Sequence, residues 1–163
     1  MTTPHLLATF FIGDTHLAID AAVVQEVLYG QQVFPVPGTE RSVLGLMNLR
    51  GQVVTTIDLA RRMGTERSTP TEKCFHVVVR TDEGPVSLVV DNVSQVFDAS
   101  DLTPDPPPDT LDSRLVSLVS GVHQREGNLL LVLDVAEATA ERGIHADSEE
   151  STTAGVEGTP VDA

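Results

Sequence analysis

The 163-residue chain is poor in cationic side chains. It has one Lys, Lys73, and nine Arg against 24 Asp and Glu, so its formal net charge is −14. Nucleic-acid binding depends on basic surfaces that neutralise phosphates. The charge balance therefore excludes nucleic acid as a partner, and the scattered Arg residues give no basic patch for a membrane surface.

The chain also has few long apolar runs, cysteines and aromatic residues, which further limits the class of protein it can be. No apolar run approaches the ~18 residues of a membrane span, and the N-terminal MTTPHLL lacks the basic region of a secretory signal. We therefore expect no direct membrane insertion and a cytoplasmic location. The single Cys74 cannot form an internal disulfide, and we expect it to be a packed structural thiol. With no Trp, one Tyr and five Phe, the core must be aliphatic.

Two segments are set apart by composition. Residues 98–113 contain four Pro and five Asp with no basic residue, which predicts an extended, solvated segment. Residues 143–163 contain five acidic residues, no Lys or Arg and no aromatic residue, which predicts a disordered acidic tail. Each segment contributes −5 to the net charge, so the remainder is close to neutral and free to dock on other proteins.

The rest of the chain is typical of short β-strands joined by turns. The predicted strands include 6–13, 15–20, 74–81, 86–91, 92–97, 115–123 and 128–133. Two short helices, 59–63 and 135–142, are predicted to follow the capping residues Asp58 and Asp134. Many short strands with turns between them indicate small barrels or a sandwich.

An internal repeat sharpens the predicted fold. Residues 45–60 (GLMNLRGQVVTTIDLA) align without a gap to residues 121–136 (GVHQREGNLLLVLDVA), with two Gly, one Asp and one Ala coinciding. A weaker similarity relates 18–27 to 89–96. Chance similarity of two hairpins is the alternative, but the shared order and spacing favour two similar subdomains packed as a pair.

No arrangement of residues supports catalysis. The five His show no metal-ligand spacing, and phosphate-binding glycine motifs and a nucleophile elbow are absent from the sequence. His76 and His123 are interpreted as ordinary, partly exposed residues of strands or hairpins. The strand-ending Asp20, Asp58 and Asp91, like Asp134, fit turns and caps better than catalysis. We therefore expect no enzyme activity, no metal and no cofactor.

Two charged residues remain as candidates for partner binding. In Asn48-Leu49-Arg50-Gly51 a cation lies at a hairpin tip, where its guanidinium can pair bidentately with a partner's carboxylate. A solvated turn residue is the ordinary alternative for Arg50. Glu26 lies within the apolar run 23–27 and marks either an exposed apolar strip or the polar face of a half-buried strand.

The segment VLGLMNLRGQVVTTIDL (43–59) resembles the core signature of the CheW family of chemotaxis coupling proteins. The resemblance extends over about 6–140, through AID (18–20), VQEV (24–27), PVP (35–37), VVD (89–91) and LLLVLDV (129–135). It departs from the family at Thr55, where a Pro is usual, and at Asn92, where a Gly is common.

The resemblance implies a mainly β fold of two packed SH3-like five-stranded barrels with short helices. We place the CheW-like domain at 6–140, with subdomains of about 6–66 and 74–140 whose termini are free to interleave. It further implies a stand-alone, non-catalytic scaffold in chemotaxis. Its partners would be the cytoplasmic tip of a methyl-accepting chemoreceptor and the regulatory domain of a CheA-type histidine kinase, within membrane-associated receptor arrays.

The receptor-side positions of the family match this chain at five residues, and no kinase-side residue can be transferred. The five are Val24, Glu26, Gly45, Asn48 and Arg50. A coupler in a related chemosensory pathway, controlling twitching, biofilm or second-messenger output, is an alternative function. A small-ligand-binding β-barrel, or a hydrolase using strand-end Asp residues, is a further alternative from a different class.

Overall fold

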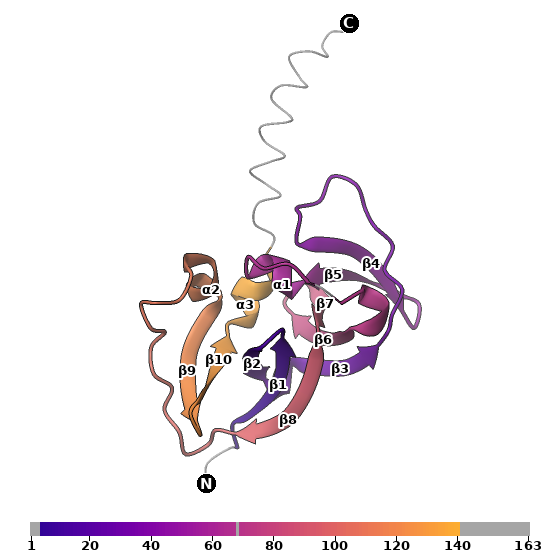
Figure 1. The fold of residues 1–163 in the computed structure, drawn as a ribbon. Helices are drawn as coiled ribbons and strands as arrows, with labels where there is room; N and C mark the ends of the chain where they lie inside the picture. The colour runs from indigo at the N-terminus through magenta and orange to yellow at the C-terminus, as the bar shows by residue number, and fades with distance from the viewer. Residues whose placement is uncertain (1–3, 68, 141–163) are drawn as a thin grey trace, which may run out of the picture.

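Two five-stranded sheets dominate the computed structural model, which describes residues 4–67 and 69–140 (Figure 1). The central barrel has the strand order β3-β6-β7-β5-β4 and consists of β3 (Val24–Tyr29), β4 (Val43–Leu49), β5 (Gln52–Asp58), β6 (Phe75–Thr81) and β7 (Gly84–Val90). The terminal barrel has the order β8-β1-β2-β10-β9 and consists of β1 (Leu6–Ile12), β2 (Thr15–Asp20), β8 (Asn92–Asp98), β9 (Val119–Arg125) and β10 (Asn128–Leu133).

Each sheet curls until its two edge strands approach each other. In the central barrel, Leu28 of β3 packs on the same apolar cluster as Met47 and Leu49 of β4, the opposite edge. In the terminal barrel, the ring of Phe97 on β8 meets that of His123 on β9 edge to face, with centroids 5.7 Å apart. The predicted pair of small β-barrels is confirmed.

The two barrels exchange hairpins between the halves of the internal repeat. Each half has five strands, β1–β5 and β6–β10, followed by a helix. The β1–β2 hairpin nevertheless pairs with β8 and β10, and the β6–β7 hairpin pairs with β3 and β5. The predicted subdomains 6–66 and 74–140 therefore do not coincide with the sheets. The chain changes barrel after Asp20 and after Asp91, where a short link carries it across.

The repeated segments occupy equivalent places in the two barrels. β5 lies parallel to β7 as β10 lies parallel to β2. The bridge between Phe34 and Leu46 has its counterpart between Asp105 and Val122. The two-residue turns match as well, with φ of 53° and 85° at residues 50 and 51 and of 49° and 83° at residues 126 and 127.

Three short helices lie close together at one end of the molecule (Figure 1). They are α1 (Leu59–Arg62), α2 (Ser113–Leu118) and α3 (Val135–Thr139), and the 3-10 turns are η1 (Ala21–Val23) and η2 (Thr71–Lys73). Asp58 caps α1 and Asp134 caps α3, as predicted, by accepting hydrogen bonds from backbone N–H groups. The part of the predicted helix 135–142 that follows Ala140, and the acidic segment 143–163, lie outside the described residues.

The largest apolar cluster lies between the barrels and is mainly aliphatic. Phe10 and Leu17 of the terminal barrel pack there with Ile57, Val77 and Leu88 of the central barrel. Smaller clusters fill each barrel interior. Strands such as β6 are therefore buried on both faces, by the barrel interior on one side and by the other barrel on the other.

This double burial corrects the interpretation of two His residues. His76 on β6 is 0% exposed and His123 on β9 is 5% exposed, although both were predicted to be partly exposed. His76 Nδ1 lies 3.2 Å from the Ser87 hydroxyl, and burial lowers the pKa of the His76 imidazole. Cys74, which precedes β6, is buried as predicted, and burial raises the pKa of its thiol to about 11.

A second correction concerns the predicted strand 115–123. Its first part belongs to helix α2, which ends at Leu118, and only the remainder forms β9. Asp112 accepts a hydrogen bond from the backbone N–H of Arg114 and so caps a helical turn. Leu118 is then buried in the core between the barrels, which anchors the turn.

Candidate functional site

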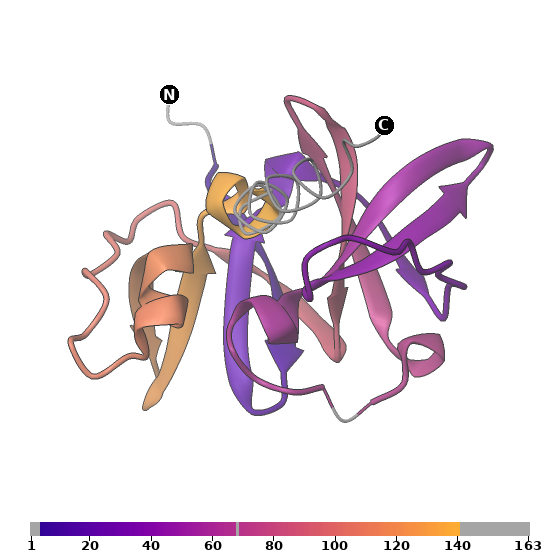
Figure 2. The same cartoon turned by 90° about the horizontal axis from the view of Figure 1, so that it is seen from above.

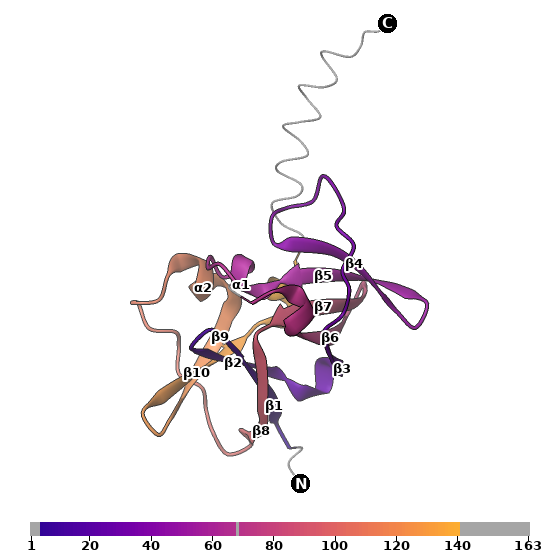
Figure 3. The same cartoon turned by 45° about the vertical axis from the view of Figure 1, so that its right-hand side comes forward.

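The hairpin of β4 and β5 extends beyond the body of the central barrel (Figures 2 and 3). Its two-residue turn, Arg50-Gly51, has positive φ at both positions, as in the type I′ turns that join twisted strands. The Asn48 side-chain oxygen accepts a hydrogen bond from the Gly51 N–H at 2.8 Å. Asn or Gly is the usual first residue of such a turn, so the Arg occupies a backbone conformation that disfavours it.

Arg50 holds a carboxylate of its own chain. Its Nη1 lies 2.5 Å from Glu26 Oε2 and its Nη2 lies 2.6 Å from Oε1, which is a bidentate pair. The Arg50 side chain is 71% exposed and that of Glu26 is 18% exposed. The hydrogen bonds from Arg50 lower the pKa of the Glu26 carboxyl, and the same bonds raise the pKa of Arg50. Both groups are therefore charged at neutral pH.

Glu26 lies beside exposed apolar side chains of β3. Its side chain is on the same face of the strand as that of Leu28, whereas Val24 is on the other face, because the pairing of β3 with β6 shifts register between Val24 and Glu26. Val27 and Tyr29 point to the face opposite Glu26 and are 45% and 57% exposed. The Arg50 pair satisfies the half-buried carboxylate where β3 meets the β4–β5 hairpin.

The other two predicted residues are buried or half-buried near this pair. Val24 pairs with Val79 and packs against the core between the barrels. Gly45 is buried, has φ of 147°, and would bring a Cβ into the Phe34 carbonyl. Of the five predicted residues, Asn48 and Arg50 are therefore exposed at the hairpin tip, and the half-buried Glu26 of β3 pairs with Arg50. Gly45 permits the close crossing of the segment at Phe34 beneath it.

A groove of about 690 Å³ begins beside this hairpin. Its lining includes Leu46 and Val53 from the hairpin, Val36 from the crossing segment, Pro85 from the β6–β7 turn and Ala136 from α3. Val53 is 65% exposed, although it lies on a strand next to the fully buried Val54. None of these residues was predicted from the sequence, because the groove forms between separate elements of the chain.

The terminal barrel carries a separate pocket, mainly polar, with two exposed apolar side chains. Val96 on β8 is 60% exposed and Leu129 on β10 is 42% exposed, and both line a pocket of about 260 Å³. The pocket also includes Gln95 and Glu126. Glu126 occupies the turn position equivalent to Arg50, so the two barrels present opposite charges at corresponding tips.

Comparison with known proteins assigns the chain to a family. The family model described as a CheW-like domain matches residues 7–142. The chain belongs to the CheW-like family. The resemblance inferred from the N-L-R-G hairpin is thereby confirmed.

Individual members of the CheW-like family cover most of the chain. Chemotaxis protein CheW of Rhizobium meliloti is 30% identical over 129 residues, which is 79% of this chain and 83% of that protein. Protein PilI of Pseudomonas aeruginosa is 29% identical over 119 residues, 72% of this chain and 66% of that protein. The crystal structure of scaffolding protein TtCheW from Thermoanaerobacter tengcongensis superposes with a TM-score of 0.70 at 23% identity, covers 81% of this chain and 90% of that one, and supports the fold.

In this CheW-like chain the departure at Thr55 falls in the groove. Thr55 is half-buried and lines the groove together with Val53 on the same face of β5. The departure at Asn92 is exposed at the start of β8, away from the hairpin. Among residues 4–67 and 69–140, no helix has the length and hydropathy needed to cross a membrane.

Proposed function

We propose that this chain is a non-catalytic cytoplasmic adaptor that couples methyl-accepting chemoreceptors to a CheA-type histidine kinase at membrane-associated arrays. The observation that carries the proposal is the Glu26–Arg50 pair on the hairpin whose Gln52 and Val53 line a groove with both apolar and charged side chains. An ion pair near such a groove suits recognition of an amphipathic helix, whose apolar side chains meet the apolar part of the groove while its polar ones meet the charged groups. The receptor tip is the partner we assign to this surface.

The kinase regulatory domain is assigned to the terminal barrel. Exposed Val96 and Leu129 offer apolar contact there, and Glu126 supplies a charge opposite to that of Arg50. Apolar side chains exposed together mark protein-binding sites more often than isolated ones do. Because the two surfaces belong to different barrels, one molecule can hold both partners at once, which is what a coupler requires.

Charge reversal at Arg50 tests the receptor side. Arg50→Glu places two carboxylates at the hairpin, and we expect capture of a purified receptor tip to weaken about tenfold or more. Capture of the kinase regulatory domain should not change. Arg41→Glu is the matched control, because Arg41 is also 71% exposed and also pairs with a Glu. The receptor assignment is wrong if both variants bind the tip equally well.

An apolar-to-acidic change on each barrel separates the two surfaces. Val96→Asp should weaken capture of the kinase regulatory domain about tenfold and leave receptor binding unchanged. Removing the new carboxylate from water at an apolar contact costs binding free energy. Val53→Asp should have the converse effect. Both side chains are more than half exposed, so the melting temperature should stay within a few degrees in each variant. Equal losses for both partners in either variant would contradict separate surfaces.

A related chemosensory pathway is the second candidate function. It is supported by the similarity to PilI of Pseudomonas aeruginosa, which extends over 72% of this chain. Co-purification from the native cell distinguishes the two, because the kinase recovered with the chain identifies the pathway. Recovery of no kinase would count against both.

A further inference from the structure

Four of the nine Arg residues line one pocket of about 410 Å³ on the helical end of the molecule. They are Arg41, Arg61, Arg62 and Arg114, and Ser42 and Ser117 contribute hydroxyl groups. Glu40 is the only acidic residue in the lining. In a chain with a net charge of −14, this concentration of cations predicts an anionic occupant.

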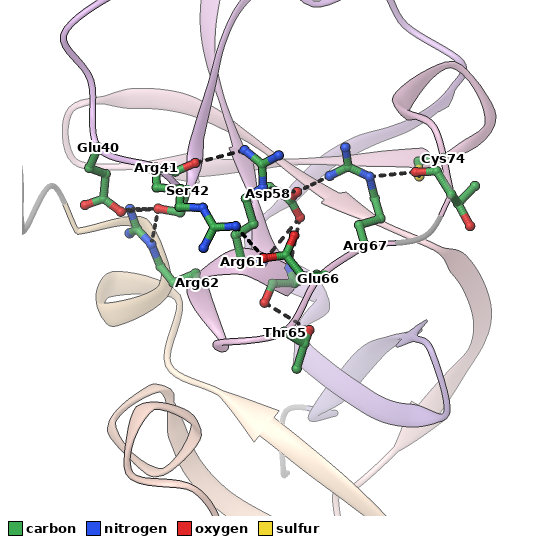
Figure 4. Close-up of polar contacts among 12 residues, drawn as sticks. Glu40, Arg41, Ser42, Asp58, Arg61, Arg62, Thr65, Glu66, Arg67 and Cys74 are labelled. Carbon is green, nitrogen blue, oxygen red and sulfur yellow. Dashed lines mark hydrogen bonds and ion pairs between the residues drawn. The ribbon is translucent and has the colours of Figure 1, made fainter.

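Arg62 is a buried Arg in the lining of this arginine pocket, and Figure 4 shows its polar contacts with neighbouring side chains. Its side chain is 4% exposed and donates to Ser42 Oγ, to Glu40 Oε1 at 2.9 Å and to the carbonyl oxygens of Ala138 and Ala140, at 3.0 and 2.5 Å. Ala140 is the last described residue. The point from which the C-terminal segment continues is therefore fixed beside the pocket.

The remaining cations are available to a ligand to different degrees. Arg114 is exposed and makes no ion pair within residues 4–67 and 69–140. Arg61 is one-third exposed; its Nε lies 3.5 Å from Asp58 and its Nη1 donates to the Arg41 carbonyl. Arg41 pairs with Glu66, and both side chains are more than two-thirds exposed, so solvent screens this pair. Arg114 and Arg61 are the groups that an incoming carboxylate would meet first.

We propose that the arginine pocket binds the acidic C-terminal segment of the same chain, residues 143–163. This segment carries five acidic residues and neither Lys nor Arg. The first acidic residues, Asp147, Glu149 and Glu150, follow Ala140 by seven to ten positions, so an extended chain of ~3.3 Å per residue spans more than 20 Å and easily reaches the pocket. Tethering also gives the segment a local concentration on the order of millimolar.

The arginine pocket adjoins the groove, because Arg62 lines both, and lies apart from the receptor-side ion pair and the kinase-side residues. The pocket lies between α1 and α2, whereas the receptor-side pair is at the tip of the β4–β5 hairpin and the kinase-side residues are on β8 and β10. The interaction rests on exposed charges, so raising the ionic strength weakens it. This inference does not depend on which partners the barrels bind.

A paramagnetic label on the intact chain tests the proposal. Ser148→Cys takes a nitroxide selectively, because the only native thiol, Cys74, is buried with its pKa raised to about 11. In ¹⁵N-labelled protein at low salt, we expect line broadening of the Arg61 and Arg114 side-chain Nε–H signals and of the α1 and α2 amides. The broadening should disappear at 0.5 M NaCl.

Three variants and one mixing experiment make the result decisive. Arg114→Glu should abolish the broadening, whereas Arg80→Glu, an exposed Arg on β6 outside the pocket, should not. Replacing the tail acids in Asp147→Asn, Glu149→Gln and Glu150→Gln should abolish it without touching the folded core. Broadening that also appears when labelled ¹⁴N protein is mixed with unlabelled ¹⁵N protein would assign the pocket to a second copy and overturn the proposal. Absence of broadening would overturn it as well.

Discussion

Arg50 combines a left-handed backbone conformation, which is unfavourable for Arg, with a favourable ion pair. Its φ of 53° suits Asn or Gly, yet the residue is a long cation whose guanidinium takes both oxygens of Glu26. Glu126, at the equivalent turn, has φ of 49° and a charge of the opposite sign. The backbone cost of Arg50 is thus set against an ion pair with Glu26, and the equivalent turns of the two barrels carry charges of opposite sign.

Arg50→Asn separates these two roles. Asn accepts the left-handed conformation, so the loss of the exposed ion pair is offset and the melting temperature should change by less than about 4 °C. Capture of the receptor tip should still fall about tenfold, because the cation is gone. Thermal scans and capture assays on the same samples measure both effects.

Glu126→Asn is the control for this substitution. Asn suits the left-handed backbone conformation of residue 126 on the terminal barrel as it does that of residue 50. The substitution should leave receptor capture unchanged. A large drop in the melting temperature of Arg50→Asn would show instead that the ion pair is chiefly structural. Equal receptor binding by Arg50→Asn and the parent chain would remove Arg50 from the receptor surface.

At the scale of the element, β4 depends on a crossing that only glycine permits. The segment at Phe34 exchanges two backbone hydrogen bonds with Leu46, at 2.8 and 2.9 Å, directly beside Gly45. The equivalent Gly121 lies beneath the bridge from Asp105 to Val122, and a Cβ there would come within 2.8 Å of Pro104. The repeated Gly in the sequence thus marks the same crossing in both barrels.

Gly45→Ala should therefore destabilise the chain more than backbone strain alone predicts. The new Cβ would overlap the Phe34 carbonyl, and we expect a loss of about 3 kcal/mol or more in the free energy of unfolding. Gly84→Ala is the control, because φ there is 109° with no atom within 4 Å of the added Cβ, and it should cost only about 1–2 kcal/mol. Urea unfolding measures the free energy of unfolding of both variants. Equal losses would mean that the segment at Phe34 moves away from the new Cβ at little cost.

Much of the element inventory was predictable from the sequence because it depends on local chemistry. Turn glycines and the capping residues Asp58 and Asp134 mark hairpins and helix starts that the structure confirms. The helical start of residues 115–123 was missed because β-propensity outweighed one Asp cap. His76 was misjudged because alternation describes a strand with one buried face, and both faces of β6 are buried.

The candidate site was only partly predictable for a similar reason. Glu26 and Arg50 were each selected by their own surroundings, but their pairing joins positions 24 residues apart and depends on the curl of the barrel. The groove depends on the packing of α3 and the β6–β7 turn against the hairpin, which no local pattern encodes. Family resemblance supplied the positions, and the structure supplies the geometry of their contacts.

At the scale of the whole molecule, the exchange of hairpins makes each barrel depend on both halves of the chain. The terminal barrel needs β1 and β2 from the first half, and the central barrel needs β6 and β7 from the second. The largest apolar cluster lies between the barrels, and the buried Arg62 joins α1 to the end of α3. The central barrel is one continuous segment, residues 24–90, inserted between the strands of the terminal barrel, but its interior cluster is much smaller than the cluster that the two barrels share.

The chain should therefore unfold in one cooperative transition rather than barrel by barrel. Tyr29, the only Tyr in a chain without Trp, reports the central barrel by fluorescence, and the His123 ring signal reports the terminal barrel by NMR. Both probes should give the same urea midpoint. Arg62→Leu removes the buried link and should lower both midpoints together, because it leaves Glu40 without its cation and two backbone carbonyls without donors. If the two midpoints separate in the parent chain, the barrels are independent units and the exchanged hairpins do not couple them.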